Sequence, residues 1–216
     1  MHFDTPSFIC IFVTVIPKLS HMMKETKKLL LIVDPQTDFI SGTLPVPGAG
    51  AAMDRLAAYI KAHDGEWAEK VVTNDWHPAT HCSFQPNGGE WPVHCLQYSE
   101  GAAIYRPLLD VLNATQGETV VLQKGLAPDH EEYSIMENEL SHDMLFMELS
   151  PYYEHNITDV DICGLAGDIC VLNTLRDMLN TFGKEIRFHL LTAFSPSIDG
   201  GQALEAFLAE HPEVRA

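Results

Sequence analysis

Side chains that could do chemistry together follow four separate apolar runs of this sequence. Asp34 follows residues 29–33, Asp75 and His77 follow 71–73, Lys124 follows 119–122, and Cys170 follows 160–165. If these runs are parallel strands, their carboxyl ends meet at one edge of a sheet, where ligands gather. Taken singly, such residues are usually turn, cap or solvated residues. Together, a thiol, a carboxylate, an ammonium and metal-type ligands predict nucleophilic catalysis beside a metal.

The thiol lies at the start of a helical pattern, in the stretch GLAGDICVLNTLRDML. Only a thiolate is a strong nucleophile, and a helix N-terminus lowers the pKa of a cysteine, so Cys170 is a candidate nucleophile. Asp34 is the candidate base for its proton, and Lys124 would offset the developing charge. Asp168 is placed to cap the helix, while N–H groups of the turn could bind an oxyanion. The alternative is a buried apolar cysteine, which is our interpretation of Cys163.

A second cluster lies in the stretch NDWHPATHCSFQPNGGEWPVHC, which is too long and too rich in His, Pro, Gly and Cys for a simple crossover. Asp75 and His77 are two residues apart, so an extended backbone projects them to one side, and His94 could complete three metal ligands. Solvated loop histidines are one alternative. The other is a closed structural zinc site that uses His81, Cys82, His94 and Cys95.

The elements that must position these residues alternate along the chain. The apolar runs are rich in β-branched residues and do not alternate with polar ones, which is typical of strands covered on both faces. Between them lie helical patterns with one apolar face. The alternation predicts a three-layer α/β sandwich with a parallel sheet. The predicted strands are residues 29–33, 71–73, 119–122, 160–165 and 186–192, and the clearest helices are 53–60 and 171–182.

Length and charge limit the class of protein. The 216 residues suffice for one domain with a full core. A formal net charge of −17 opposes binding to phosphate backbones and anionic lipid, so we expect neither a nucleic-acid partner nor a membrane partner.

Cysteine usage and the first residues bear on the compartment. The five cysteines are scattered and odd in number, which predicts a reducing, cytoplasmic compartment. An apolar run, SFICIFVTVI, precedes Met22 and Met23, but it lacks a basic start and an A-x-A-like cleavage site. We therefore expect residues 1–21 to be a leader or unpacked extension and residues 22–216 to be a single domain.

Five segments, IVDPQTDF, TNDWHPATHCSF, WPVHC, LQKG and GLAGDICV, occur in an order that resembles the nicotinamidase (pyrazinamidase) branch of the isochorismatase-like hydrolases. The resemblance covers about residues 28–209. It implies a central, mostly parallel six-stranded sheet. It also implies a metal-dependent amidohydrolase that converts nicotinamide to nicotinate and ammonia through a cysteine thioester, a step of NAD salvage. The alternative is another cysteine amidase of the superfamily that acts on a carbamoyl or ureido compound.

The resemblance also assigns roles to individual residues. It implies a cis peptide bond between Leu165 and Ala166. One divalent ion is implied, zinc first, with iron or manganese as alternatives, because carboxylate and imidazole ligands suit all three. The resemblance does not determine the oligomeric state, and a homo-oligomer is one of the alternatives. The implied catalytic triad is Asp34, Lys124 and Cys170; the oxyanion donors are the amides of Ala166 and Cys170; the metal ligands are Asp75, His77 and His94, with Ser83 as an additional contact; and the residues that stack on the substrate are Phe39, Trp91 and Tyr133.

Two departures from the family pattern stand out. Gly167 occupies a position where relatives often carry threonine, and the segment between Phe84 and Trp91 is short. We expect the first to loosen the turn before the nucleophile and the second to alter the rim of the metal pocket.

Overall fold

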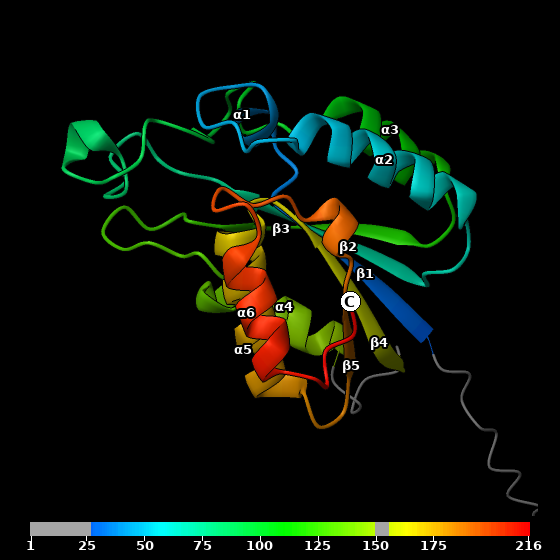
Figure 1. Cartoon of the computed structure of the whole chain (residues 1–216). Coiled ribbons are helices and arrows are strands. Elements are labelled where there is room, and N and C mark those ends of the chain that lie inside the picture. Colours follow the sequence, from blue (N-terminus) through cyan, green and yellow to red (C-terminus); the bar gives the residue numbers. More distant parts are fainter. Residues whose placement is uncertain (1–26, 150–155) are drawn as a thin grey trace, which may run out of the picture.

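The computed structural model describes residues 27–149 and 156–216. The predicted leader, residues 1–21, lies outside the described residues. The described chain alternates strands and helices as the sequence predicts. Figure 1 shows the strands side by side with helices on both faces of the sheet, so the three-layer α/β fold is confirmed. No helix in these two ranges is long and apolar enough to cross a bilayer.

Within the described residues the sheet is parallel throughout, and their first strand lies at its centre. The strand order is β3-β2-β1-β4-β5, and each neighbouring pair is parallel. Each of the predicted apolar runs overlaps one strand. The strands are β1 (Lys27–Val33), β2 (Glu69–Asp75), β3 (Glu118–Lys124), β4 (Ile157–Gly164) and β5 (Arg187–Leu190).

The expected sixth strand is reduced to a single bridge in the described residues. Arg215 pairs in parallel with His189 of β5. The N–H of Leu190 donates to the carbonyl of Arg215 over 2.7 Å, and the N–H of Arg215 donates to the carbonyl of Phe188 over 3.1 Å. The chain around Arg215 therefore lies beside β5, where a sixth strand would lie, but a single bridged residue is not a strand. The described sheet has five strands and not six.

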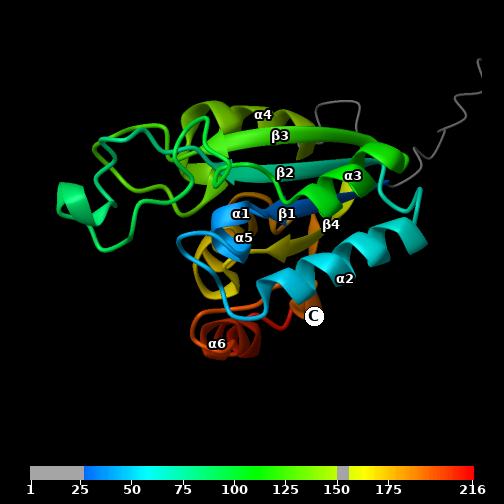
Figure 2. The same ribbon diagram turned by 90° about the horizontal axis from the view of Figure 1, so that it is seen from above.

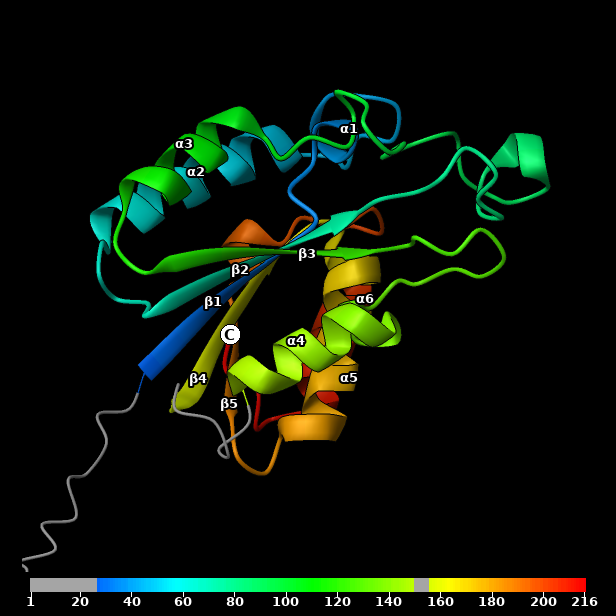
Figure 3. The same cartoon turned by 180° about the vertical axis from the view of Figure 1, so that it is seen from behind.

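Helices cover the two faces of the sheet unequally. Figures 1 and 3 show α2 and α3 over one face and α4, α5 and α6 over the other. Figure 2, from above, shows α1 at the end of β1 where the strand leaves the sheet. The helices are α1 (Thr37–Ile40), α2 (Ala49–Ala62), α3 (Arg106–Ala114), α4 (Glu139–Leu149), α5 (Leu172–Phe182) and α6 (Gln202–Glu210), with short 3₁₀ turns at Gln85–Asn87, Ile135–Glu137 and Thr192–Phe194.

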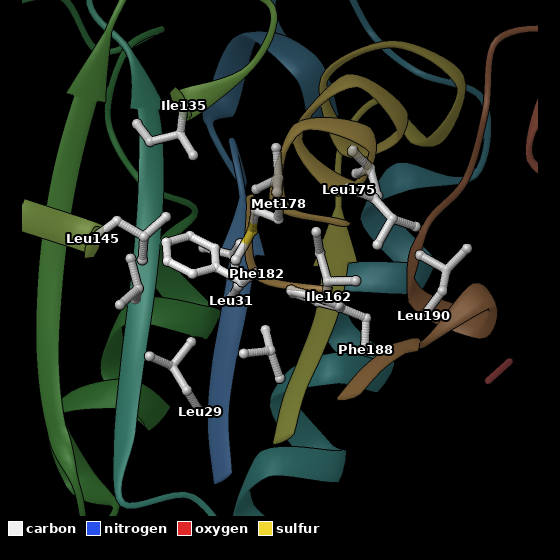
Figure 4. Packing of buried hydrophobic residues seen from close by; sticks show 14 of the residues in the cluster. Leu29, Leu31, Ile135, Leu145, Ile162, Leu175, Met178, Phe182, Phe188 and Leu190 are labelled. Atoms are coloured by element: carbon white, nitrogen blue, oxygen red, sulfur yellow. The ribbon is translucent and has the colours of Figure 1, made fainter. Parts of the chain in front are cut away.

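The central strand β1 explains why its run is apolar throughout. Leu29, Leu31 and Val33 point into the cluster under α4, α5 and α6, and Leu30 and Ile32 point into the cluster under α2 and α3. All five side chains are fully buried. Figure 4 shows Leu31 and Ile162 of the sheet beside Met178 and Phe182 of α5. Each such side chain contributes about 1.5–3 kcal/mol through burial, which is why residues 29–33 of this strand carry no polar side chain on either face.

The segment predicted to be functional is irregular. Between β2 and α3 the described chain has one 3₁₀ turn, at residues 85–87, and isolated bridges such as His77 with Leu96. It lies at the end of the sheet where β1 and β2 finish. The fold thus leaves a long, side-chain-rich segment free to shape a site at the carboxyl edge of the sheet.

We predict that Gly164→Ala destabilises the fold. Gly164 has φ +131°, and a Cβ there would lie 2.0 Å from the carbonyl oxygen of Val33. Strain and collision together should lower the free energy of unfolding by about 3 kcal/mol or more, measured by urea denaturation. The matched control is Gly48→Ala, at φ +80° with open space around it, which should cost about 1–2 kcal/mol. Equal losses in the two variants would contradict the steric account.

Candidate active site

The carboxyl ends of four strands bring the predicted residues together. Asp34 directly follows β1 with φ +46°, and Asp75 and Lys124 are the last residues of β2 and β3. Cys170 follows β4 across a short turn. Ligand atoms of Asp34, Asp75 and Cys170 all lie within 4.8 Å of one another. The convergence expected from the strand ends is therefore present.

Lys124 is the centre of this group. Its side chain is fully buried, and its Nζ lies 3.0 Å from Oδ2 of Asp34, in contact with Oδ1 of Asp75, and 3.7 Å from Sγ of Cys170. It also donates to the carbonyl of Glu132 over 3.1 Å. Burial alone would lower the pKa of Lys124, but the two carboxylates hold that pKa well above its usual value. The lysine is thus a fixed buried cation.

Asp34 is fully buried, and Thr73 of β2 holds it in addition to Lys124. Its Oδ1 accepts a hydrogen bond from the hydroxyl of Thr73 over 2.6 Å, and its N–H donates to the carbonyl of Thr73 over 3.1 Å. Burial raises the pKa of Asp34, although Lys124 and Thr73 oppose that shift. A carboxylate with a raised pKa beside a thiol is suited to accept a proton and return it.

Cys170 differs from the sequence-based expectation in one respect. It lies in a π-helical turn, Gly167–Val171, that leads into α5, and only 6% of it is exposed. Burial raises the pKa of the thiol well above its usual value, and Lys124 offsets only part of that effect. The net shift of this pKa is therefore upward, opposite to the lowering that we expected from the helix N-terminus. A buried thiol of this kind needs the adjacent base.

The turn before Cys170 is also arranged differently from the prediction. The peptide bond between Leu165 and Ala166 is cis, as the resemblance implies. Asp168 does not cap the helix: its Oδ1 and Oδ2 accept hydrogen bonds from the N–H groups of Ile198 and Asp199 over 3.0 Å and 2.9 Å. Its carboxylate therefore anchors the loop after β5.

Asp75, His77 and His94 form a pre-shaped cradle for a cation. Their ligand atoms lie within 4.8 Å of one another, and all three residues are buried. Nδ1 of His77 donates to the carbonyl of Gly125 over 2.9 Å, which leaves its Nε2 buried without a hydrogen-bond partner. Nδ1 of His94 likewise faces the carbonyl of Pro92 at 2.8 Å. An orphaned buried acceptor is costly, so these residues fit a divalent metal ion.

Other residues of the His-rich segment between β2 and α3 lie outside the three-residue cradle. The hydroxyl of Ser83 is 2.7 Å from Nδ1 of His81, so it pairs with a histidine outside the cradle. His81 and Glu131 form a second group with His77 whose ligand atoms lie within 4.8 Å of one another. Neither Cys82 nor Cys95 belongs to any such group within the described ranges, which disfavours the closed structural zinc site.

Two positioning residues were not predicted, although both occur in the quoted stretch IVDPQTDF. Gln36 is fully buried and clamps the end of β2: its Nε2 donates to the carbonyl of Asp75 over 2.7 Å, and its Oε1 accepts the N–H of Asp75 over 2.8 Å. Asp38 accepts the N–H of Cys95 over 2.7 Å, next to His94. Their position just after the apolar run 29–33 was the sequence signal that could have identified these polar residues.

A pocket lined mainly by apolar side chains, with a few polar groups among them, opens beside Cys170, and this composition is typical of small-molecule sites. The three predicted aromatic residues line it, and Nε1 of Trp91 donates to the hydroxyl of Tyr133 over 3.1 Å. Most other lining side chains are apolar, and Glu131 and Ile198 are additions that the sequence did not indicate. The lining residues are Phe39, Leu44, Val46, Asp75, Trp91, His94, Glu131, Tyr133, Ala166, Ile169, Cys170 and Ile198.

This fold and site define a cysteine-containing α/β protein with a metal cradle, and comparison with known proteins assigns the family. The isochorismatase domain model matches residues 28–187, so the chain belongs to the isochorismatase family. It is 30% identical over 192 residues to the nicotinamidase/pyrazinamidase of Mycobacterium tuberculosis, covering 87% of this chain and 94% of that protein.

Solved structures give the same result. A pyrazinamidase of Pyrococcus horikoshii in complex with zinc is 30% identical, with a TM-score of 0.69, over 88% of this chain and 97% of that chain. The L. infantum protein PnC1 in complex with nicotinate is 29% identical, with a TM-score of 0.70, over 86% of this chain and 88% of that chain.

We predict that Lys124→Met strongly destabilises the metal-free protein. Removing the ammonium leaves two buried carboxylates, Asp34 and Asp75, without their cation, at an expected cost of about 3–5 kcal/mol. The measurement is urea unfolding in the presence of a chelator. Lys70→Met is the matched control, because Lys70 is equally buried but donates to carbonyl groups of residues 112–116. It should cost about 1–3 kcal/mol, and a loss as large as that of Lys124→Met would contradict the charge argument.

A second prediction concerns metal content. His94→Ala should weaken metal binding by about 100-fold or more, since it removes one of three ligands, and elemental analysis after dialysis should show the loss. His130→Ala is the control, because that side chain is 58% exposed and outside the cradle. Cys82→Ser should retain the metal. Loss of metal in Cys82→Ser as well as in His94→Ala would favour the closed structural zinc site instead.

Proposed function

We propose that this chain is a nicotinamidase that hydrolyses nicotinamide to nicotinate and ammonia through a thioester on Cys170. The observation that carries the proposal is the contact of a buried ammonium with a thiol and two carboxylates, one of which belongs to a metal cradle in the same pocket. The family assignment and the nicotinamidase relatives support the same activity.

The pocket would bind an uncharged aromatic amide between aromatic walls. Phe39, Trp91 and Tyr133 offer flat apolar surface, and the bond between Trp91 and Tyr133 fixes the two loops that carry them. A divalent ion held by Asp75, His77 and His94 would supply a Lewis-acidic partner for the ring nitrogen of the substrate. Phe39, Trp91 and Tyr133 would orient the ring with its carboxamide towards Cys170.

Acylation begins with the Asp34–Cys170 pair. Asp34 accepts the thiol proton, and Lys124 stabilises the thiolate that results. The sulfur attacks the amide carbon while the amides of Ala166 and Cys170 hold the oxyanion. Asp34 then returns the proton to the departing nitrogen, ammonia leaves, and a thioester remains. Such acid–base transfer typically contributes roughly 10²- to 10⁴-fold to the rate.

Deacylation repeats this chemistry with water. Asp34 accepts a proton from the attacking water, and the oxyanion again lies against the Ala166 and Cys170 amides. Collapse of the intermediate breaks the C–S bond and releases nicotinate, and the proton on Asp34 returns to the sulfur. The same carboxylate thus serves both half-reactions, which suits a group whose pKa is raised by burial.

The proposal extends to the setting of the enzyme. Residues 22–216 would form the single domain, in the cytoplasm, with a small-molecule substrate and neither nucleic acid nor membrane as partner. The acidic balance of the chain supports this, since a net charge of −17 repels polyanions. The resident metal is zinc, iron or manganese, all of which accept these ligands.

The decisive assay is ammonia release from nicotinamide by the metal-loaded protein. We expect turnover in the native chain and a loss of at least about 10³-fold in Cys170→Ala, with a thioester mass adduct in the native chain that the variant lacks. His142→Ala, on α4 and outside the pocket, is the control and should keep native turnover. A metal-loaded native protein that releases ammonia from a ureido or carbamoyl compound but not from nicotinamide would favour the other cysteine amidase.

A further inference from the structure

Ile198 has an apolar side chain at the mouth of the pocket. No other element covers this side chain fully. It lines the same pocket as Cys170 and Ile169, yet it is 46% exposed. It lies on the loop that follows β5, in the sequence SPSIDGG. An exposed isoleucine is unremarkable by itself, but here its position is fixed by the turn that carries the nucleophile.

Three hydrogen bonds join this loop to the nucleophile turn. The N–H groups of Ile198 and Asp199 donate to the two carboxylate oxygens of Asp168 over 3.0 Å and 2.9 Å. The N–H of Gly167 donates to the carbonyl of Pro196 over 2.9 Å. Asp168 is only two residues before Cys170, so the loop and the sulfur share one support.

The close approach of the loop requires glycine at position 167. A Cβ there would lie 2.4 Å from the carbonyl oxygen of Ser195 and 2.5 Å from the hydroxyl of Ser197. From the sequence we expected the change from threonine to glycine to loosen this turn. The structure shows a closely packed turn instead. The glycine allows the loop to pack directly on the turn and brings Ile198 to the pocket.

The far side of Ile198 is fixed as well. The carboxylate of Asp199 accepts hydrogen bonds from the N–H groups of Gly201 and Ala203 over 2.7 Å and 2.8 Å, at the start of α6. Ile198 is therefore held between the nucleophile turn and a helix. These hydrogen bonds hold the backbone at Ile198, so its side chain projects from a fixed point and not from a mobile flap.

We propose that Ile198 is a specificity-determining residue of this enzyme, and that Asp168 and Gly167 position it. The proposal rests on the proposed function, because it concerns the amide that Cys170 attacks. Ile198 would pack against the edge of the aromatic ring and become covered when substrate binds. The preferred substrates are thus uncharged aromatic amides with no substituent on that ring edge.

Two physical effects give this selectivity. Covering the exposed part of an isoleucine with a ring favours binding through the hydrophobic effect, and a charged or polar substituent placed there would lose water without gaining a partner. A bulky substituent would collide with a wall that the Asp168 hydrogen bonds prevent from moving aside. Truncating the wall should therefore weaken nicotinamide binding and admit larger rings.

The first experiment compares kcat and KM for nicotinamide with those for 5-methylnicotinamide and 6-methylnicotinamide. For Ile198→Ala we expect KM for nicotinamide to rise roughly three- to tenfold. We also expect the kcat/KM ratio of at least one methylated amide to nicotinamide to rise about tenfold. Ile198→Val should be intermediate. The matched control is Leu140→Ala, an exposed leucine of α4 outside the pocket, which should not change the ratio.

The second experiment tests the positioning role of Asp168. Asp168→Ala should shift the same ratio in the same direction, Asp168→Asn should partly restore it, and the double variant with Ile198→Ala should show no shift beyond Ile198→Ala alone. If the shift in the double variant equals the sum of the shifts in the two single variants, the positioning role of Asp168 is overturned. If Asp168→Ala yields no folded protein by circular dichroism, the Asp168→Asn cycle decides the point.

The two proposals can fail separately. Native protein that releases no ammonia from nicotinamide would overturn the proposed function. Native protein that turns over nicotinamide, together with an Ile198→Ala variant whose ratios for both methylated amides stay unchanged, would overturn the role of Ile198 alone.

Discussion

The burial of one ammonium group between two carboxylates is the constraint on which the rest of the site depends. Lys124 has no exposed surface, and a charge in that position is tolerated only because Asp34 and Asp75 surround it. Lys124 and Asp75 end β3 and β2, Asp34 directly follows β1, and these three strands are adjacent in the sheet. The parallel register of the sheet therefore places the carboxylates that offset the desolvation of the ammonium. The ammonium in turn holds the strand ends together.

Asp75 connects the two halves of the site. One oxygen contacts the ammonium of Lys124, and the other lies 3.5 Å from Nε2 of His77 in the cradle. Although burial alone would raise the pKa of Asp75, Lys124 and His77 hold it well below its usual range. The reacting groups and the group that orients the substrate are thus not independent modules. They share the carboxylate of Asp75, whose backbone N–H and C=O are both hydrogen-bonded to the side-chain amide of Gln36.

Much of this arrangement could be predicted from the sequence, for physical reasons that also explain the misses. Continuous β-branched runs identify buried parallel strands, and polar residues after them converge because such strands end at one edge. The raised pKa of the Cys170 thiol could not be predicted, because it depends on how completely other elements cover the sulfur. Ile198 carries no signal either: it is a single apolar residue in a Pro-, Ser- and Gly-rich loop, and only the contacts of Asp168 reveal its place.

The hydrogen bonds and contacts that assemble the reacting groups join residues far apart in the chain. Thr73 and Asp34 are 39 residues apart, Lys124 and Cys170 are 46 apart, and Lys124 and Asp75 are 49 apart. Non-local contacts of this kind form late, because closing long loops costs entropy before the contacts are made. A nascent or partly unfolded chain would therefore hold a dispersed, inert set of side chains. Recovery of enzymatic competence would mark the moment when the whole topology is complete.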